Sequence, residues 1–185
     1  MSASELKPKV VILALVLGGL LGEIMKLNYR LERFGEILQK KIGSKESDFV
    51  KGFVTSSLIF CVGAMAIIGA IESGLLGNHK ILFVKSALDG ITSIILSSSL
   101  GIGVLFSAIP VFIYQGAITV LASGLQAILI DPVIDYMTAT GGLLIIGIGL
   151  NVLGIKNINA ANLLPSIFIV IPIIFIALRF FPSYI

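Results

Sequence analysis

Charged residues are scarce in this chain, and their scarcity excludes a water-soluble globular protein. Only 12% of the 185 residues are charged, whereas an ordinary soluble domain has roughly 25%. Fifteen of the 23 charged residues precede Gly52, so the remaining 134 residues hold only eight. So few charges cannot build a water-facing surface, and the apolar composition also excludes a disordered or nucleic-acid-binding protein.

Cysteine and histidine are almost absent, and each absence removes a kind of chemistry. The one cysteine, Cys61, lies in an apolar run and allows neither an intrachain disulfide nor a thiolate metal cluster. The one histidine, His79, cannot form a histidine metal site by itself. The chain also has no Gly-x-Ser-x-Gly nucleophile motif and no Walker loop. We therefore expect no enzymatic activity and no cofactor.

Apolar residues are abundant instead. They make up 57% of the sequence and raise its mean hydropathy to +1.09. This composition indicates an integral membrane protein. A net charge of +3 and a pI of about 9.1 would otherwise suggest a polyanionic partner, but here they fit basic loops that face an anionic lipid leaflet.

Six apolar segments approach the length of about 17–25 residues that crosses the hydrocarbon core of a bilayer. They lie at residues 10–25, 52–71, 81–98, 101–125, 137–155 and 162–180. These segments predict an all-α, polytopic transmembrane bundle in a single integral membrane domain. The first segment is not a secretory signal, because no small-residue cleavage site follows it and Gly18-x-x-x-Gly22 offers a face for close helix packing.

The turn between the third and fourth segments is the hardest to place. Residues 91–130 are nearly uninterrupted and too long for one crossing, so the chain must turn within them. The serines and glycines at residues 97–103 are one candidate, and Pro110 is the other. We favour the first, since proline is tolerated inside membrane helices when neighbouring groups satisfy the freed carbonyl. Both choices give six spans.

The segment between the first two spans is basic and amphipathic. Within residues 27–42 apolar residues recur at three- and four-residue steps, with charged residues on the other face. This pattern favours an interfacial helix on the membrane surface over a soluble partner-binding helix. Eight Lys and Arg residues fall on this side of a six-span arrangement and five, Lys85 among them, on the other. Residues 27–51 are therefore expected in the cytoplasm, with both termini outside.

A weak internal repeat appears when the sequence is compared with itself at an offset of 84 or 85 residues. Thr55 then matches Thr140, and Gly63 matches Gly147. The repeat pairs spans one to three with spans four to six, and because three is odd, the halves would run in opposite directions. Inverted halves are the architecture of many secondary transporters. The alternative is that glycine-rich apolar helices resemble each other by composition alone.

Asp89 is the main candidate for a functional residue. It lies about halfway along the third span, where inserting an aspartate costs roughly 3 kcal/mol. Ser86, Ser93 and Ser97 share its helix face, which therefore carries a carboxylate and three hydroxyls. Such a face must lie against protein or water, and its oxygens suit a hard cation or a proton relay. The alternative is that these groups only join helices by hydrogen bonds.

Three amide side chains are candidates for opposing ligands. Asn151 lies inside the fifth span, and Asn162 begins the sixth span shortly before Pro165. Asn162 can equally cap its helix, and Asn151 can equally bond a neighbouring helix. Gln115 in the fourth span either coordinates substrate or locks two helices together.

Several blocks of the sequence resemble one known family. They are GFVTSSLIFCVGAMAIIG from Gly52, KSALDGITS from Lys85, LGIGVLFSAIPV from Leu100, GGLLIIGIGLN from Gly141 and NLLP from Asn162. In this order, across residues 11–172, they resemble the YdfK/YqgA family of prokaryotic inner-membrane proteins. The resemblance implies a multi-pass protein of that membrane but no substrate, because the family is uncharacterised. Members usually carry a further apolar repeat before the position of Val10, so the chain is either a natural short form or truncated at its start.

These observations together predict a secondary transporter of a small solute or ion, coupled to a cation or a proton through Asp89. We expect the protein to lie in the lipid bilayer and to form a homo-oligomer through its glycine faces. The alternatives are a passive ion channel lined by the serines, or a membrane scaffold or sensor that acts through the amphipathic helix. The predicted binding residues are Asp89, Ser86, Ser93, Ser97, Gln115, Asn151 and Asn162.

Overall fold

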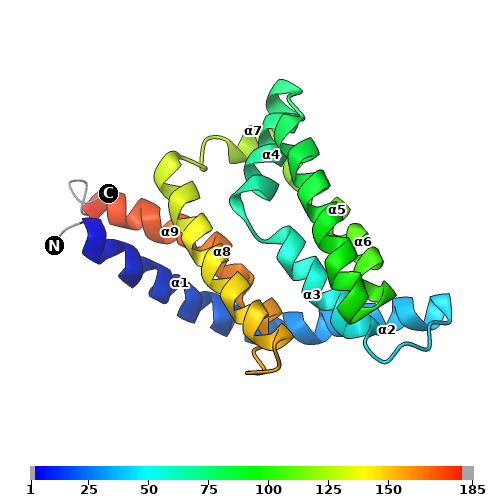
Figure 1. Ribbon diagram of the computed structural model, residues 1–185. Coiled ribbons are helices and arrows are strands. Elements are labelled where there is room, and N and C mark those ends of the chain that lie inside the picture. The colour runs from blue at the N-terminus through cyan, green and yellow to red at the C-terminus, as the bar shows by residue number, and fades with distance from the viewer. Residues whose placement is uncertain (1–2, 181–185) are drawn as a thin grey trace. The chain divides into compact units, whose positions relative to one another are not determined.

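The computed structural model describes residues 3–180, and every regular element in that range is helical. This confirms the predicted all-helical fold. Two short 3-10 helices, η1 and η2, lead into α6 and α9. In chain order the elements are α1 (Ala3–Met25), α2 (Leu27–Ile42), α3 (Phe49–Cys61), α4 (Ala64–Leu76), α5 (Lys80–Leu100), η1 (Ile102–Ser107), α6 (Ala108–Val120), α7 (Ala122–Leu125), α8 (Asp131–Val152), η2 (Ala160–Leu163) and α9 (Pro165–Phe180) (Figure 1).

Within the described residues, five helical segments are long and apolar enough to cross a membrane, and the number is six if one bent pair of helices is counted as one span. The bent pair is α3 and α4, whose axes differ by 62°. It covers the apolar segment predicted at residues 52–71, and the break within it was not predicted. The break falls where Val62 is extended and Gly63 has a φ of 130°. Glycine adopts this φ without the steric cost that a side chain brings.

The turn after the third span lies where the sequence predicted it. Helix α5 ends at Leu100, and Gly101 turns the chain with a φ of 74°. Pro110 lies in the first turn of α6, where its missing N–H costs no helical hydrogen bond. The fifth span, α8, begins at Asp131 rather than at the predicted Met137, because Pro132 fits the first turn of a helix instead of a loop.

The chain forms two compact units. In the described part of the chain, unit 1 holds α1, α8, η2 and α9, and unit 2, residues 29–125, holds α3 to α7 with most of α2. Each unit thus takes one span from each pair that the internal repeat matched. The predicted halves were spans one to three and spans four to six. In the structure, unit 1 holds the first, fifth and sixth spans, and unit 2 holds the second, third and fourth.

In unit 1 the glycine face of α1 packs against η2 and α9 (Figure 1). A Cβ atom added at Gly18 would lie 2.5 Å from the Cβ of Ser166, and one at Gly22 would lie 2.6 Å from the carbonyl carbon of Asn162. Only glycine allows so close an approach, so the predicted close packing of this face is confirmed. Because the face is covered within the chain, the predicted self-association cannot use it.

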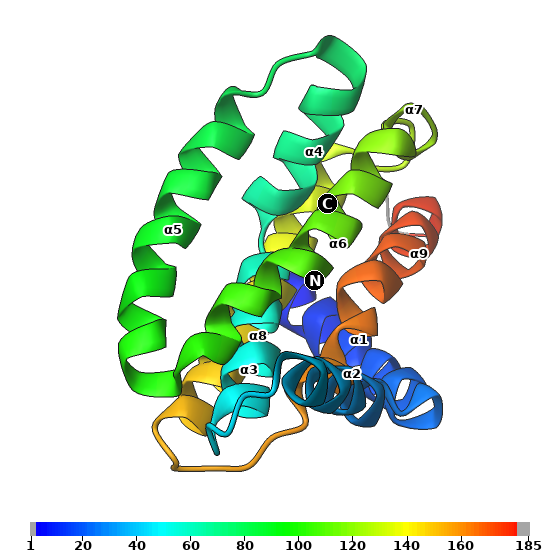
Figure 2. The same ribbon diagram turned by 90° about the vertical axis from the view of Figure 1, so that its right-hand side faces the viewer.

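Unit 2 is built around α3, which packs against η1, α5 and α6. Phe49 and Phe53 of α3 are fully buried, and the Phe49 ring lies 5.4 Å from that of Phe106 in η1. A Cβ added at Gly103 would lie 3.0 Å from the Cα of Phe49, so η1 and α3 are in close contact. Figure 2 shows α4 and α5 as an antiparallel hairpin with α6 beside α4. The first residues of α3 and of η1 therefore lie at the same end of unit 2 as the last residues of α5. This arrangement is the one expected if the three spans of the unit cross the membrane in alternating directions.

Helix α2 coincides with the amphipathic helix predicted at residues 27–42. Its Gly35 is buried against α3, since a Cβ added there would lie 2.9 Å from the Phe53 ring. The ring of Phe34 lies 5.8 Å from the same ring. Tyr29 and Ile37 remain exposed, and the position of this surface at the membrane interface stays a prediction.

Candidate functional site

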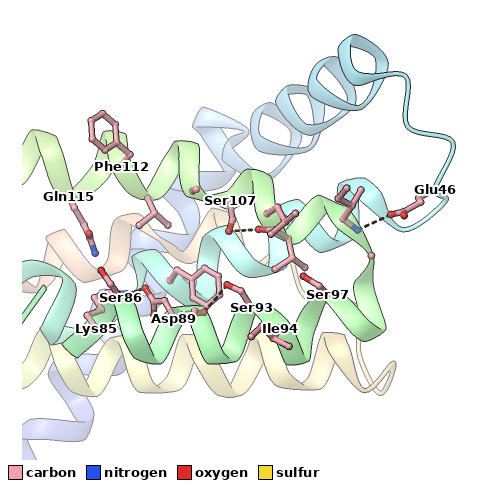
Figure 3. A pocket seen from close by; sticks show the side chains of 18 residues that line it. Glu46, Lys85, Ser86, Asp89, Ser93, Ile94, Ser97, Ser107, Phe112 and Gln115 are labelled. Carbon is pink, nitrogen blue, oxygen red and sulfur yellow. Dashed lines mark hydrogen bonds and ion pairs between the residues drawn. The ribbon is translucent and has the colours of Figure 1, made fainter. Parts of the chain in front are cut away.

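Unit 2 contains a cavity of about 900 Å³ beside α5. Its walls come from α5, η1 and α6, with Phe60 from α3 and Glu46 from the loop between α2 and α3 (Figure 3). The predicted polar face of the third span therefore borders the cavity, although Ser86 itself is exposed, and Gln115 faces it from α6. Five of the seven predicted binding residues line the cavity, namely Ser86, Asp89, Ser93, Ser97 and Gln115.

Asp89 has a partner that sequence reasoning missed. Lys85 lies one helical turn earlier on α5, and its Nζ donates to Asp89 Oδ2. Its ammonium also lies 6.0 Å from the centroid of the Phe60 ring, within cation–π range. The signal was the four-residue spacing between a lysine and an aspartate. Lys85 was counted above among the charges beyond the membrane, but it lies inside the third candidate span. Without it, four basic residues remain on that side against eight.

The two charges of this pair depend on each other. The Lys85 side chain is only 9% exposed and that of Asp89 27% exposed, so water compensates neither charge fully. Removing one partner of a buried pair costs about 3–5 kcal/mol, because the other charge is left uncompensated. The exposed part of Asp89 lines the cavity, where a bound group can reach it. Either charge is therefore released only when something else compensates its partner.

Two polar groups of the cavity lack a hydrogen-bond partner. Among the described residues, Ser97 Oγ and Gln115 Nε2 are the buried side-chain atoms in this condition. An unpaired buried polar group costs about 1–3 kcal/mol, so both indicate a place for a bound molecule. Ser93, by contrast, donates to the backbone oxygen of Asp89 at 2.7 Å. Its hydroxyl can still accept a hydrogen bond from the cavity.

Glu46 lies at the other end of the cavity, on the exposed loop between α2 and α3. Its Oε2 accepts a hydrogen bond from the N–H of Ile102 at 2.9 Å, beside the turn at Gly101. From Lys85 to Gly101 the chain follows about 24 Å of helix. The cavity thus connects the buried ion pair with a loop outside the spans (Figure 3). No local pattern predicted this contact, because the two residues are 56 positions apart.

The break between α3 and α4 lies close to the ion pair. Phe60, the last residue but one of α3, has its ring centroid 6.0 Å from Lys85 Nζ. The last turn of a helix carries carbonyl groups without helical partners and the negative end of the helix dipole. The Lys85 ammonium therefore lies near a helix end that favours a positive charge.

The two predicted asparagine ligands belong to unit 1, where their amides already have partners. Asn151 donates to the carbonyl oxygen of Ile158 at 2.6 Å and accepts from its N–H at 2.7 Å. Asn162 accepts from the N–H of Asn28 at 2.7 Å and donates to Glu23 Oε2. Asn151 thus holds the loop after its own helix rather than a neighbouring helix, and Asn162 bonds residues at the junction of α1 and α2 rather than capping its own helix. We therefore leave them out of the site proposed below.

Metal ligands are not gathered at the cavity. Across the part of the chain that the structure describes, no three His, Cys, Asp or Glu side chains lie together where they could hold a metal ion. A joined ammonium and carboxylate suit a solute or a proton better than a resident divalent cation, which takes several oxygen ligands.

The sequence matches, over residues 1–175, the family described as "Protein of unknown function (DUF554)". The chain belongs to this family. It is 37% identical over 169 residues to the "Uncharacterized membrane protein YdfK" of Bacillus subtilis (strain 168), covering 91% of this chain and 71% of YdfK. It is 32% identical over 169 residues to the "Uncharacterized protein YqgA" of Escherichia coli (strain K12), covering 88% and 72%. No solved structure matches. The resemblance to YdfK and YqgA is thus confirmed, and this DUF554 protein is a multi-pass membrane protein.

Proposed function

We propose that this DUF554 protein is a secondary transporter that carries a small solute across the prokaryotic inner membrane, with the cavity of unit 2 as its binding site. The observation that carries the proposal is the Lys85–Asp89 pair inside a cavity of about 900 Å³. Cavities of about 300–1,000 Å³ commonly hold small organic molecules. Charged groups at membrane depth are costly, and they usually line the path of a substrate or an ion.

Asp89 couples transport to a cation or a proton in this proposal. When either one neutralises the Asp89 carboxylate, Lys85 loses its partner and becomes free to bind another group. The hydroxyls of Ser86, Ser93 and Ser97 line the same helix face and offer oxygens along the path. The sequence alone pointed to Asp89 as the coupling residue, and in this proposal Lys85 also takes part, because it links the coupling ion to the solute.

The architecture of the units supports the proposal. Secondary transporters commonly place their site at a broken helix between inverted repeats. The α3–α4 break lies near the ion pair. Each unit holds one span from every repeated pair, as expected of two inverted repeats that have exchanged a span. With the basic residues 27–51 in the cytoplasm, the end of the cavity at Glu46 faces the cytoplasm as well.

Ligand binding by the purified protein is the first test. A solute that binds the folded state at 100 times its Kd adds about 2.7 kcal/mol of stability. A panel of ions and metabolites should therefore contain members that raise the melting temperature. If no member of the panel raises the melting temperature, the result contradicts the proposal.

Uptake by proteoliposomes is the second test, with Asp89→Asn as the variant. We expect this variant to fold and to lose gradient-driven accumulation, because its amide cannot take up a coupling proton. Asp48→Asn makes the same change on an exposed loop of unit 2, so it should accumulate solute normally. Unchanged accumulation in Asp89→Asn would remove Asp89 from the mechanism. Ion currents at a fixed voltage, without solute counterflow, would indicate the channel instead.

A further inference from the structure

The inner end of the cavity is rich in hydrogen-bond donors. Gln115 Nε2 is a donor without a partner. Lys85 Nζ carries three hydrogens, of which the bond to Asp89 uses one. Figure 3 shows the Gln115 amide directed from α6 toward the part of α5 that carries Lys85, Ser86 and Asp89. Donors of this kind match the acceptor oxygens of a carboxylate, which forms strong charge-assisted hydrogen bonds with an ammonium group.

The charge balance of the pair determines what an anion needs in order to bind there. An anion that bonds to Lys85 takes it away from Asp89 and leaves a second, uncompensated carboxylate in a partly buried site. One proton on Asp89 removes that charge. The cavity then holds a bonded ammonium and carboxylate, as before, together with a neutral carboxylic acid. Anion and proton thus enter without changing the net charge of the site.

We propose that the cavity binds a small organic anion with a carboxylate group, and that each anion is carried together with one proton held by Asp89. This rests on the function proposed above and names its substrate class. Lys85 and Gln115 bind the carboxylate, and Asp89 takes the proton when Lys85 turns to the anion. Ser97 lies about 18 Å from Lys85 along α5, and it offers an unpartnered hydroxyl on the path toward Glu46.

The other titratable groups near Asp89 leave it as the proton acceptor. The charged residues that line the cavity, among those described, are Lys85, Asp89 and the distant Glu46. The elements packed against α5 add the Cys61 thiol from α3 and Glu72 from α4, which accepts a bond from Asn78 at 2.9 Å. Helix α6, across the cavity, adds Tyr114. Because Cys61 follows Phe60, whose ring centroid lies 6.0 Å from Lys85 Nζ, Cys61→Ser is a necessary control and should preserve proton coupling.

Other classes of solute match the site less well. A cation would bond to Asp89 and leave Lys85 uncompensated. A neutral solute would leave the pair intact and would need no proton. A zwitterion could replace both partners at once, and its transport would then not follow a pH gradient. These differences make the substrate class measurable.

Thermal stability of the purified full chain tests the class by binding. The probes are pyruvate as anion, glycine as zwitterion, choline as cation and glycerol as neutral solute, at equal concentration and ionic strength. We expect pyruvate to raise the melting temperature, and more so as the pH falls. Stabilisation by one of the other probes without pyruvate would overturn the anion assignment and leave the transporter proposal standing. No stabilisation by any of them would count against both.

Transport by the wild-type protein tests the proton. A gradient of one pH unit should drive about tenfold accumulation of pyruvate through one-proton symport, measured against protein-free vesicles. A clamped potential of 100 mV should change accumulation less than twofold, whereas net movement of one charge would change it about 50-fold. A large response to the potential would overturn the one-to-one coupling, and so would a sodium gradient that replaces the pH gradient.

Variants separate the two roles in the pair. Asp89→Asn should retain pyruvate exchange and lose the tenfold pH-driven accumulation, whereas Lys85→Gln should lose both. Lys80→Gln removes an exposed lysine from the start of the same helix, and it should retain both pyruvate exchange and pH-driven accumulation. The double variant Lys85→Gln/Asp89→Asn removes both charges together, so its folding shows whether a single variant failed only from an unpaired charge. Full exchange in a folded Lys85→Gln protein would overturn the assignment of Lys85.

Discussion

The close contact of α1 with η2 makes Gly22→Ala a demanding test of the packing in unit 1. The added Cβ would lie 2.6 Å from the carbonyl carbon of Asn162 and nearer still to its oxygen. Carbon atoms in contact prefer separations of about 3.5–4.0 Å, so α1 must move away by roughly 1 Å. That movement pulls Glu23 from the Asn162 amide and strains the 2.7 Å bond between Asn162 and the N–H of Asn28.

The size of the effect follows from these contacts. Overpacking a close contact costs about 1–3 kcal/mol, and each weakened hydrogen bond adds about 0.5–1.5 kcal/mol. The higher helix propensity of alanine returns at most about 1 kcal/mol. We therefore expect Gly22→Ala to lower the free energy of unfolding by about 1–5 kcal/mol. Each kcal/mol corresponds to about 2–4 °C of melting temperature in a chain of this size.

The assay is thermal melting in detergent, followed by far-ultraviolet circular dichroism. Gly142→Ala in α8 is the matched control, because nothing lies within 4 Å of the Cβ it would add. The control should melt at the wild-type temperature or slightly above it. Equal melting temperatures for Gly22→Ala and Gly142→Ala would refute the packing argument and place α1 further from η2 than the structure has it.

Two more predictions concern the backbone. Gly63→Ala should destabilise the protein by about 1–3 kcal/mol, because alanine is strained at a φ of 130°. The control is Gly116→Ala, which adds a Cβ in open space. Equal melting temperatures for the two variants would show that position 63 does not require this φ. Asn151→Ala removes both bonds to Ile158 and should speed trypsin cleavage after the exposed Lys156 about tenfold. Cleavage at the wild-type rate, as expected of the control Asn157→Ala, would show that the amide does not hold the loop.

The polar face of α5 was predictable because its signal is local. Ser86, Asp89, Ser93 and Ser97 are spaced by three or four residues, and one helix of sufficient length is enough to bring them to one side. The cost of exposing them to lipid then requires that this side face protein or water. The structure adds the opposing wall, including Gln115, whose position depends on how α6 packs and not on any nearby residue.

Long-range contacts had no such local signal. Asn162 and Glu23 are 139 positions apart, and Glu46 and Ile102 are 56 apart. Their pairing depends on which helix ends come together. An asparagine in an apolar sequence equally suits a ligand, a cap or a helix contact, so its role could be assigned only after its partners were known.

The broken span shows a different limit of sequence reasoning. Gly63 and Gly147 match in the internal repeat, yet Gly63 breaks the second span while Gly147 lies inside the continuous helix α8. Glycine permits either conformation, and its surroundings decide between them. In unit 2 the break leaves the end of α3 near Lys85. Unit 1 has no counterpart of this lysine, because the offset of 84 residues that pairs Gly63 with Gly147 takes Lys85 to Ile169 of α9.

Lys85 also changes what a buried aspartate means in this protein. A lone carboxylate at membrane depth attracts any cation or proton, and its occupancy by itself selects no solute. When a carboxylate is paired with an ammonium group, neither charge can bind another group until its partner is compensated in some other way. A ligand that binds one of the two groups therefore decides the state of the other. One helical turn of α5 is thereby sufficient to link the protonation of Asp89 to the binding of an anion at Lys85. For the same reason the double variant, which removes both charges together, should be more stable than either single variant, each of which leaves one charge uncompensated.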